Sequence, residues 1–285
     1  MSLLRKIVVV AGPTASGKSD FAVELALKHN GEVLSADSCQ IYKGLDIGTG
    51  KITKEEMKGV KHYLLDICDI NESFSVADFK DRAITIIDDI LARGKTPIIV
   101  GGTGQYIDAI MYENEPPKVP PNKKLRLELE ALSTEVLFAR IKKADPLRAD
   151  TIDRYNKVRL VRALEIIDAI GKVPKQTVLK KRFEIEFYLM NPNKELLEKR
   201  VHVRLLKRFD MGMIQEMKNL IAQGYEIGII AEKGIEYKYM AKYLKGKITY
   251  DELIEQLRIT TWQYAKRQRT WNKKYTLFAK LVDVS

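Results

Sequence analysis

Cysteine and histidine are scarce in this chain, and the few that occur form no metal-site pattern. Among its 285 residues, Cys39 and Cys68 match neither a disulfide framework nor a CxxC zinc pair. The three histidines, His29, His62 and His202, lie far apart in the sequence. These scarcities argue against a disulfide-stabilised secreted domain and against a metal-ligand cluster.

Long apolar runs and a cleavable leader are also missing. No apolar run reaches the roughly 18 residues that a membrane-spanning helix needs. Residues 1–6 do not form a signal-peptide pattern. We therefore expect a reducing, cytoplasmic location and no membrane partner.

Basic residues outnumber acidic ones. Lysine and arginine total 49 against 38 aspartates and glutamates, giving a net charge of +11, which suggests a polyanionic partner such as nucleic acid. Residues 256–282 contain no acid and interleave basic with aromatic side chains, which suits a nucleic-acid backbone. Core packing is the alternative role for the two tryptophans. The side chains concerned are Arg258, Trp262, Tyr264, Lys266, Arg267, Arg269, Trp271, Lys273, Lys274 and Lys280.

The clearest motif follows the first apolar run. Residues 7–11 lead into Gly-Pro-Thr-Ala-Ser-Gly-Lys-Ser, which fits the phosphate-binding pattern G-x-x-x-x-G-K-[S/T] before an amphipathic helix. Gly12 and Gly17 let backbone N–H groups point at an anion, and the helix adds its positive dipole end. Lys18 supplies a mobile charge, and the Ser19 hydroxyl is a candidate ligand for phosphate-bound Mg²⁺. The predicted anion-binding residues are Gly12, Pro13, Thr14, Ala15, Ser16, Gly17, Lys18 and Ser19.

Apolar runs and amphipathic stretches alternate through the first part of the chain. This alternation predicts an α/β fold of the P-loop NTPase type, a doubly wound parallel sheet. In such a sheet ligands bind at the carboxyl ends of the strands, where Asp37 and a Gly-rich loop at 44–51 follow the second strand. The predicted strands are 7–11, 32–36, 62–67, 96–100 and 183–190.

The composition changes near residue 115. Four of the nine prolines fall within 116–121, and the pattern is then helical to about residue 181. We expect residues 1–114 and 183–285 to form a P-loop-type catalytic core with a helical C-terminal part, and residues 115–182 to form a helical insertion domain. The predicted helices from the insertion onward are 123–132, 134–143, 146–150, 158–170, 193–209, 214–223, 236–244 and 249–269.

An acid is missing where phosphate-loop NTPases usually place one. The most apolar strand, 96–100, is followed by Gly-Gly-Thr and not by the aspartate that holds Mg²⁺. Asp37, at the end of the second strand, is the nearest substitute. Spacing alone leaves two interpretations open: a variant use of the loop, or a kinase whose Asp37 accepts a proton from a substrate hydroxyl.

Taken together, the motifs resemble one family. GPTASGKS at 12–19, DSCQIYKGLDIGT at 37–49 and GGTGQY at 101–106 are similar to the tRNA dimethylallyltransferases, or tRNA isopentenyltransferases. The bacterial form fits best, because no Cys/His zinc-finger pattern is present. The match continues through RLVRALE at 159–165, RVHVR at 200–204, KGIEYK at 233–238 and YAKRQRTW at 264–271. It departs from the usual pattern at Gln105, Glu236, Trp262 and Asn272.

The resemblance implies transfer of a dimethylallyl group from its diphosphate to the exocyclic amine of the adenosine 3′ to the anticodon. The phosphate loop, Lys18 and Mg²⁺ would hold the diphosphate, and Arg204 would add positive charge. Asp37 would take the proton of the amine, and Thr103 would lie by the reacting centre. Ordinary alternatives are a turn cap for Asp37, a helix N-cap for Thr103 and a solvated helix face for Arg204.

The resemblance also implies tRNA contacts. The target base would leave its stack and enter a tunnel that meets the diphosphate site. The insertion would contact the anticodon stem-loop, although Leu160 and Val161 also fit a hydrophobic core. The implied contacts are Asp37, Ser38, Cys39, Gln40, Thr103, Arg126, Val158, Arg159, Leu160, Val161 and Arg162.

Other activities are disfavoured by particular features. An adenylate isopentenyltransferase acting on free AMP or ATP does not need the basic charge or the insertion. A small-molecule kinase would not need residues 37–49, and a non-enzymatic RNA-binding module would leave the phosphate loop without a role. We expect a monomer.

Overall fold

The computed structural model describes residues 5–113, 117, 119–174 and 180–284. Contacts within the chain group it into two compact units, residues 1–113 with 181–285 and residues 114–180. Each unit has a hydrophobic core of its own.

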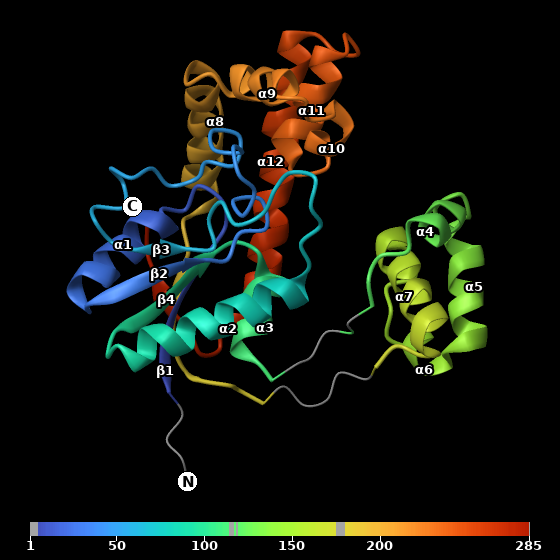
Figure 1. Cartoon of the computed structure of the whole chain (residues 1–285), viewed down its shortest axis with the longest axis horizontal. Helices are drawn as coiled ribbons and strands as arrows, with labels where there is room; N and C mark the ends of the chain where they lie inside the picture. Colours follow the sequence, from blue (N-terminus) through green and yellow to red (C-terminus); the bar gives the residue numbers. More distant parts are fainter. Residues whose placement is uncertain (1–4, 114–116, 118, 175–179, 285) are drawn as a thin grey trace. The chain divides into compact units, whose positions relative to one another are not determined.

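The larger unit is built on a six-stranded sheet whose neighbouring strands are all parallel (Figure 1). The strand order is β3-β2-β4-β1-β5-β6, which places β1 between β4 and β5. This arrangement confirms the predicted α/β fold with a parallel sheet. The strands are β1 (Lys6–Ala11), β2 (Gly31–Ser35), β3 (His62–Tyr63), β4 (Thr96–Gly101), β5 (Glu184–Met190) and β6 (Lys280–Val282).

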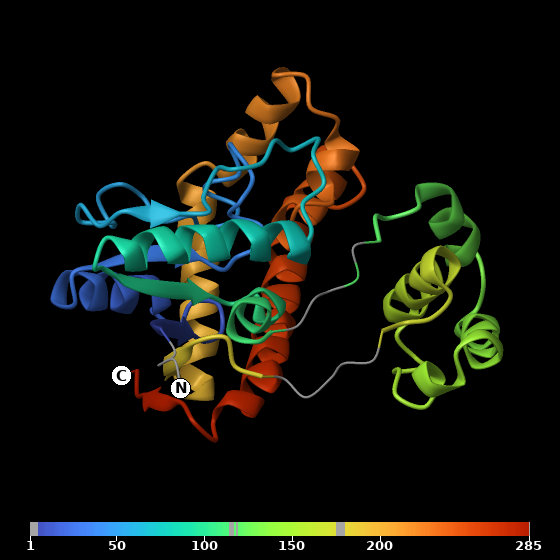
Figure 2. The same cartoon turned by 60° about the horizontal axis from the view of Figure 1, so that its bottom comes forward.

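Helices cover both faces of this sheet (Figure 2). Side chains alternate along a strand, so Ile7 and Val9 of β1 enter one core while Val8 and Val10 enter another. The first core is closed by α2 and α3, and the second by α1. These helices are α1 (Lys18–Lys28), α2 (Val76–Ala92) and α3 (Gly104–Met111).

A further core holds the C-terminal helices together. It joins Ile41 and Leu45, from the loop after β2, to Met217, Tyr237 and Leu257 of three different helices. None of the described helices has the length and apolar character needed to cross a bilayer. The C-terminal elements are α8 (Lys194–Asp210), α9 (Met213–Ala222), α10 (Ile227–Ala231), α11 (Ile235–Leu244), α12 (Tyr250–Asn272) and the short 3₁₀ turn Lys273–Tyr275.

The smaller unit is helical in its described residues. Its core contains Leu129, Leu137 and Ile141, together with Leu160 and Val161. Its helices are α4 (Lys123–Glu130), α5 (Thr134–Ala144), α6 (Pro146–Ala149) and α7 (Lys157–Ile170).

Three elements differ from the sequence prediction. The strand expected at 62–67 ends at Tyr63, because Leu64 and Asp66 adopt left-handed backbone conformations with φ of 64° and 54°. The chain instead turns toward the loop after β2, where Tyr42 and Cys68 form an isolated parallel bridge. Helix α10 and strand β6 are absent from the predicted elements, and both are short.

Candidate active site

Three neighbouring strands deliver the predicted site residues to one edge of the sheet. Strands β2, β4 and β1 are adjacent and parallel, so the loops that follow their carboxyl ends lie together. These loops are the phosphate loop after β1, the turn at Asp37 after β2 and the Gly102–Thr103 turn after β4. The sheet therefore brings the predicted anion site and the predicted base close to each other.

The phosphate loop contains one lysine that is bonded to the loop itself and one buried hydroxyl that is unpaired in the described part of the chain. The Lys18 ammonium donates to the Pro13 carbonyl oxygen at 2.6 Å. Burial, and then the nearby Arg204, lower the pKa of Lys18 to about 7. The hydroxyl of Ser16 is buried and has no hydrogen-bond partner among the described residues. The unpaired Ser16 hydroxyl is a donor available to an anion, and the Lys18 ammonium supplies charge to it when protonated.

Arg204 brings a second positive charge from α8 to the same loop. Its guanidinium donates to the Thr14 hydroxyl. Burial, and then repulsion from Arg208, lower the pKa of Arg204 to about 9, which still leaves it protonated at neutral pH. The contact with Thr14 shows that Arg204 lies beside the phosphate loop and not on a solvated helix face.

Asp37 and Thr103 both bond to the turn after β2. Asp37 Oδ1 accepts the backbone N–H groups of Cys39 at 2.9 Å and Gln40 at 3.4 Å, whereas Oδ2 has no partner among the described residues. Thr103 stands at the N-cap of α3 but makes no capping bond. Its hydroxyl oxygen instead accepts the Ser38 N–H at 3.2 Å. Asp37 is thus both a turn cap and a carboxylate with one free oxygen.

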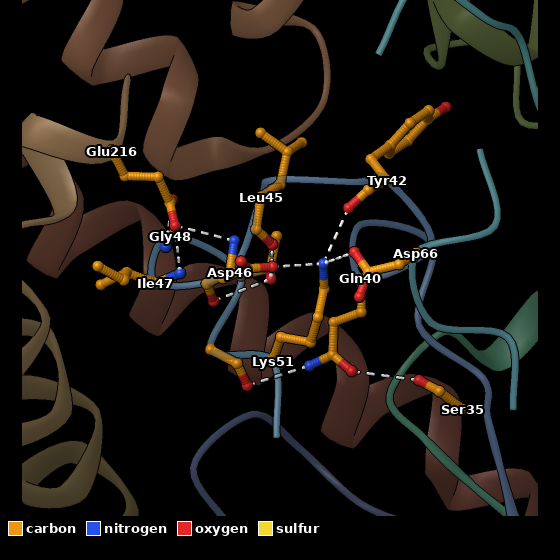
Figure 3. A network of polar contacts seen from close by, with 12 residues as sticks. Ser35, Gln40, Tyr42, Leu45, Asp46, Ile47, Gly48, Lys51, Asp66 and Glu216 are labelled. Atoms are coloured by element: carbon orange, nitrogen blue, oxygen red, sulfur yellow. Dashed lines mark hydrogen bonds and ion pairs between the residues drawn. The ribbon is translucent and has the colours of Figure 1, made fainter. Parts of the chain in front are cut away.

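Gln40 has both ends of its amide occupied. Its Nε2 donates to the Gly50 carbonyl at 3.1 Å, and its Oε1 accepts the Ser35 hydroxyl at 3.2 Å (Figure 3). In this structure Gln40 connects the Gly-rich loop to the sheet, and one N–H and one oxygen lone pair of its amide have no partner among the described residues. Its side chain still lines the cavity beside the phosphate loop.

The Gly-rich loop at 44–51 is clamped from the other side by Glu216 of α9. Its carboxylate accepts the backbone N–H groups of Asp46, Ile47 and Gly48 at 2.9, 2.6 and 3.0 Å (Figure 3). Three N–H groups on one carboxylate form an ordered turn. The clamp holds Thr49 and Gly50, the next residues of the loop, in the wall of the site.

Two cavities meet at this edge of the sheet. One lies over the phosphate loop and is lined by Lys18 and Ser19. The other, of about 950 Å³, reaches Cys39 and the loop before α11. They share a wall made of Thr14, Asp37, Thr49, Arg204 and Tyr264. The shared wall contains the candidate base Asp37, the positively charged side chain of Arg204 and the aromatic ring of Tyr264.

Several residues that line these two cavities were not predicted as site residues. Tyr264 and Gln268 of α12 line the cavity over the loop, and Arg208 and Glu236 line the larger one. Arg208 is buried and pairs with Glu236 at 3.1 Å. The motif YAKRQRTW contains Tyr264 and Gln268, but its basic residues favour a nucleic-acid surface when only the sequence is considered.

The predicted tRNA contacts in the smaller unit divide by exposure. Val158 and Arg159 are exposed, whereas Leu160 and Val161 are buried. The buried pair fits the core interpretation, and their side chains are not available to RNA in this structure. Arg126 and Arg162 are half-buried and pair with the fully buried carboxylate of Glu165, at 2.7 and 3.5 Å.

Several side chains of the basic C-terminal stretch, residues 256–282, form ion pairs or packing contacts within the protein. Arg258 pairs with Glu255, Lys274 with Asp108 and Lys280 with Glu186. Both tryptophans are half-buried, Trp271 against the sheet core and Trp262 against the core between α8 and α12. Two exposed cations, Lys266 and Arg267, lie over aromatic rings of α12. The stretch is therefore less available to a polyanion than its composition suggests.

Comparison with known proteins gives the family. A family model described as IPP transferase matches residues 40–275. The chain belongs to the IPP transferase family. Curated members include the tRNA dimethylallyltransferase of Anoxybacillus flavithermus, 42% identical over 93% of this chain and 86% of the relative. The tRNA dimethylallyltransferase of Thermoanaerobacter pseudethanolicus is 40% identical over 95% of this chain and 89% of the relative.

Solved IPP transferase structures share the fold. The tRNA isopentenylpyrophosphate transferase of Bacillus halodurans superimposes with a TM-score of 0.69 at 37% identity, covering 98% of this chain and 90% of that one. A eukaryotic dimethylallyltransferase acting on tRNA gives a TM-score of 0.82 at 28% identity, over 98% of this chain and 74% of that one. The likeness therefore extends over both units of the chain.

Proposed function

We propose that this protein transfers a dimethylallyl group from dimethylallyl diphosphate to the N6 amine of the adenosine 3′ to the anticodon in certain tRNAs, and releases diphosphate. The observation that supports this most directly is the pair of cavities with a shared wall. One is lined by the phosphate loop, and the other is large enough, at about 950 Å³, for a ligand of nucleoside size. Two substrates entering from opposite sides would meet at Asp37.

The diphosphate leaving group would bind in the cavity over the phosphate loop. Breaking the bond between the allylic carbon and the diphosphate oxygen builds negative charge on the diphosphate. Lys18, Arg204 and the N–H groups of the loop are the cationic and dipolar groups positioned to stabilise that charge. An allylic carbon tolerates positive charge, so stabilisation of the leaving group is the main contribution expected of the protein.

The proton is taken on the other side of the wall. As the new carbon–nitrogen bond forms, the adenine amine becomes acidic and transfers a proton to Asp37, whose Oδ2 has no partner among the described residues. Thr103 and Ser38 are placed beside the carboxylate to orient the base. Burial, and then the charge of Asp37, raise the pKa of Tyr264, so its phenol stays neutral in the wall.

The site fits an Mg²⁺ ion that arrives with the diphosphate. Among the described residues no group of three or more His, Cys, Asp or Glu side chains could hold a metal by itself. Mg²⁺ commonly uses substrate phosphates with few protein ligands, and the Ser19 hydroxyl lines the cavity over the phosphate loop. When bound, Mg²⁺ would neutralise charge on the diphosphate.

The test is a transfer assay with labelled dimethylallyl diphosphate and Mg²⁺. The acceptors, offered separately, are unmodified tRNA with an adenosine 3′ to its anticodon, AMP and ATP. We expect label on the tRNA alone. Label on a free nucleotide would overturn the proposed acceptor, and consumption of ATP without label transfer would indicate a kinase. Light scattering on the same preparation measures the molar mass and so tests the expected monomer. We propose that the protein acts in the cytoplasm, together with its tRNA substrate.

A further inference from the structure

Gln268 connects two loops of the site through a single buried side chain. It lies on α12 and is only 6% exposed. Its Oε1 accepts the Thr14 backbone N–H at 2.7 Å, and its Nε2 donates to the Gly102 carbonyl oxygen at 3.0 Å. The two bonds fix the amide orientation, because only the nitrogen can donate and only the oxygen can accept.

The turn after β4 is shaped to admit this side chain. A Cβ atom on Gly102 would stand 2.2 Å from Nε2 of Gln268, and one on Gly104 would stand 2.1 Å from the indole nitrogen of Trp271. One turn of α12 therefore lies directly against the Gly-Gly-Thr-Gly segment. At Gly102 the backbone φ is not positive, so the glycine is needed there for space and not for conformation.

The two hydrogen bonds of Gln268 reach loops with different proposed roles in the reaction. Thr14 belongs to the phosphate loop and is bonded to Arg204. Gly102 precedes Thr103, whose hydroxyl holds the Ser38 N–H beside Asp37. The side chain thus joins the cradle for the leaving group to the turn that carries the base.

We propose that Gln268 is a positioning residue that sets the distance between the diphosphate cradle and the Asp37–Thr103 turn. This inference rests on the proposed function. Reacting atoms must approach to about 3–3.5 Å in line, and a misplacement of about 1 Å can cost 10²-fold in rate. A side chain that fixes the cradle against the base acts on this alignment, whereas Lys18 and Arg204 supply the binding charge.

The expected signature is a fall in kcat with little change in the KM for dimethylallyl diphosphate. Gln268→Met keeps the length of the side chain but leaves the Thr14 N–H and the Gly102 carbonyl without their partner. We expect kcat to fall at least about tenfold and KM to change less than about threefold. Gln268→Glu keeps the acceptor but adds a negative charge beside the diphosphate, so its KM should rise as well.

The experiment measures kcat and KM at saturating tRNA, the Kd of inorganic diphosphate and the melting temperature. Gln263→Met is the matched control, because Gln263 is exposed on the same helix. Gly102→Ala is a second route to the same effect, since its Cβ would displace the Gln268 amide. In the double variant with Gln268→Met, kcat should fall by less than the product of the two single-variant fold-decreases.

The outcomes separate the inference from the proposed function. A wild-type protein that transfers no dimethylallyl group overturns both. With an active wild type, an unchanged kcat in Gln268→Met, or a raised KM with normal kcat, overturns the positioning role. If Gln268→Met does not fold, a normal kcat in Gly102→Ala overturns the role, and a lowered kcat at normal KM supports it.

Discussion

At the scale of single residues, Lys18 links diphosphate binding to proton binding. In the ligand-free site its pKa lies at about 7, so part of the population is neutral near physiological pH. A bound diphosphate favours the charged ammonium and raises that pKa again. Binding should therefore take up a proton at and above neutral pH.

The consequence is a pH-dependent affinity. Below pH 7 Lys18 is charged before binding; above pH 7 binding must also protonate it, so the Kd of diphosphate rises. We expect the Lys18 contribution to weaken binding about tenfold between pH 6 and pH 8. Calorimetry in buffers of different ionisation enthalpy measures the proton uptake. Lys18→Arg stays charged and removes this component; equal proton uptake in both proteins would contradict the assignment.

Asp37 offers the sharpest test of the chemistry, because its proposed role lies in the transfer step and not in diphosphate binding. Replacement by Ala or Asn removes the proton acceptor, and general-base catalysis is typically worth 10²–10⁴-fold. We expect transfer to tRNA to fall by about that range while the Kd of diphosphate stays within about threefold. Asp210→Asn, at the exposed end of α8, is the control. Retained transfer in the Asp37 variants would remove Asp37 as the base.

At the scale of elements, the loop at 44–51 depends on a helix far along the chain. The Glu216 carboxylate accepts three backbone N–H groups and also the Tyr237 hydroxyl at 2.6 Å. In Glu216→Gln the amide NH₂ would face donors and leave at least one N–H unpaired. We expect a loss of about 1–3 kcal/mol in the free energy of unfolding and slower transfer, because Thr49 and Gly50 line the cavity.

Urea denaturation and steady-state transfer assays on the same preparations check this expectation. Glu24→Gln is the matched control, since Glu24 is exposed on α1. A Glu216→Gln protein with wild-type stability and wild-type kcat would show that the loop keeps its place without the clamp.

These contacts show where prediction from sequence ends. Strands such as β1 and β4 were predictable because fully buried strands are continuous apolar runs between helices. The early end of β3 was not, because the left-handed Leu64 and Asp66 have no local sequence signal. The phosphate loop and Asp37 were found because their chemistry lies in contiguous residues. The partners Glu216 and Gln268, more than 160 residues from the loops they hold, were found only in the fold.

At the scale of the whole molecule, some basic side chains form ion pairs within the protein, and others are exposed to solvent. Three of the basic residues at 256–282 are neutralised by acids of the protein. In the smaller unit, the buried Glu165 holds Arg126 and Arg162 with their guanidinium groups partly exposed. Arg159, on the same helix, is exposed. Arg159 is thus the arginine of α7 that we expect to contact tRNA phosphates.

We therefore expect the charge of Arg159 to affect the salt dependence of tRNA affinity but not the Kd of diphosphate. Phosphate contacts release counterions, so tRNA affinity should fall steeply as salt rises. Arg159 belongs to the smaller unit, whereas the phosphate loop belongs to the larger one. Arg159→Gln should weaken tRNA binding and reduce the salt slope by about one contact, with an unchanged Kd for diphosphate. Lys28→Gln, at the end of α1 away from the site edge, is the control. Filter-binding titrations over a series of salt concentrations measure both slopes. A salt-independent affinity, or equal slopes for Arg159→Gln and the wild type, would show that α7 does not contact tRNA phosphates through Arg159.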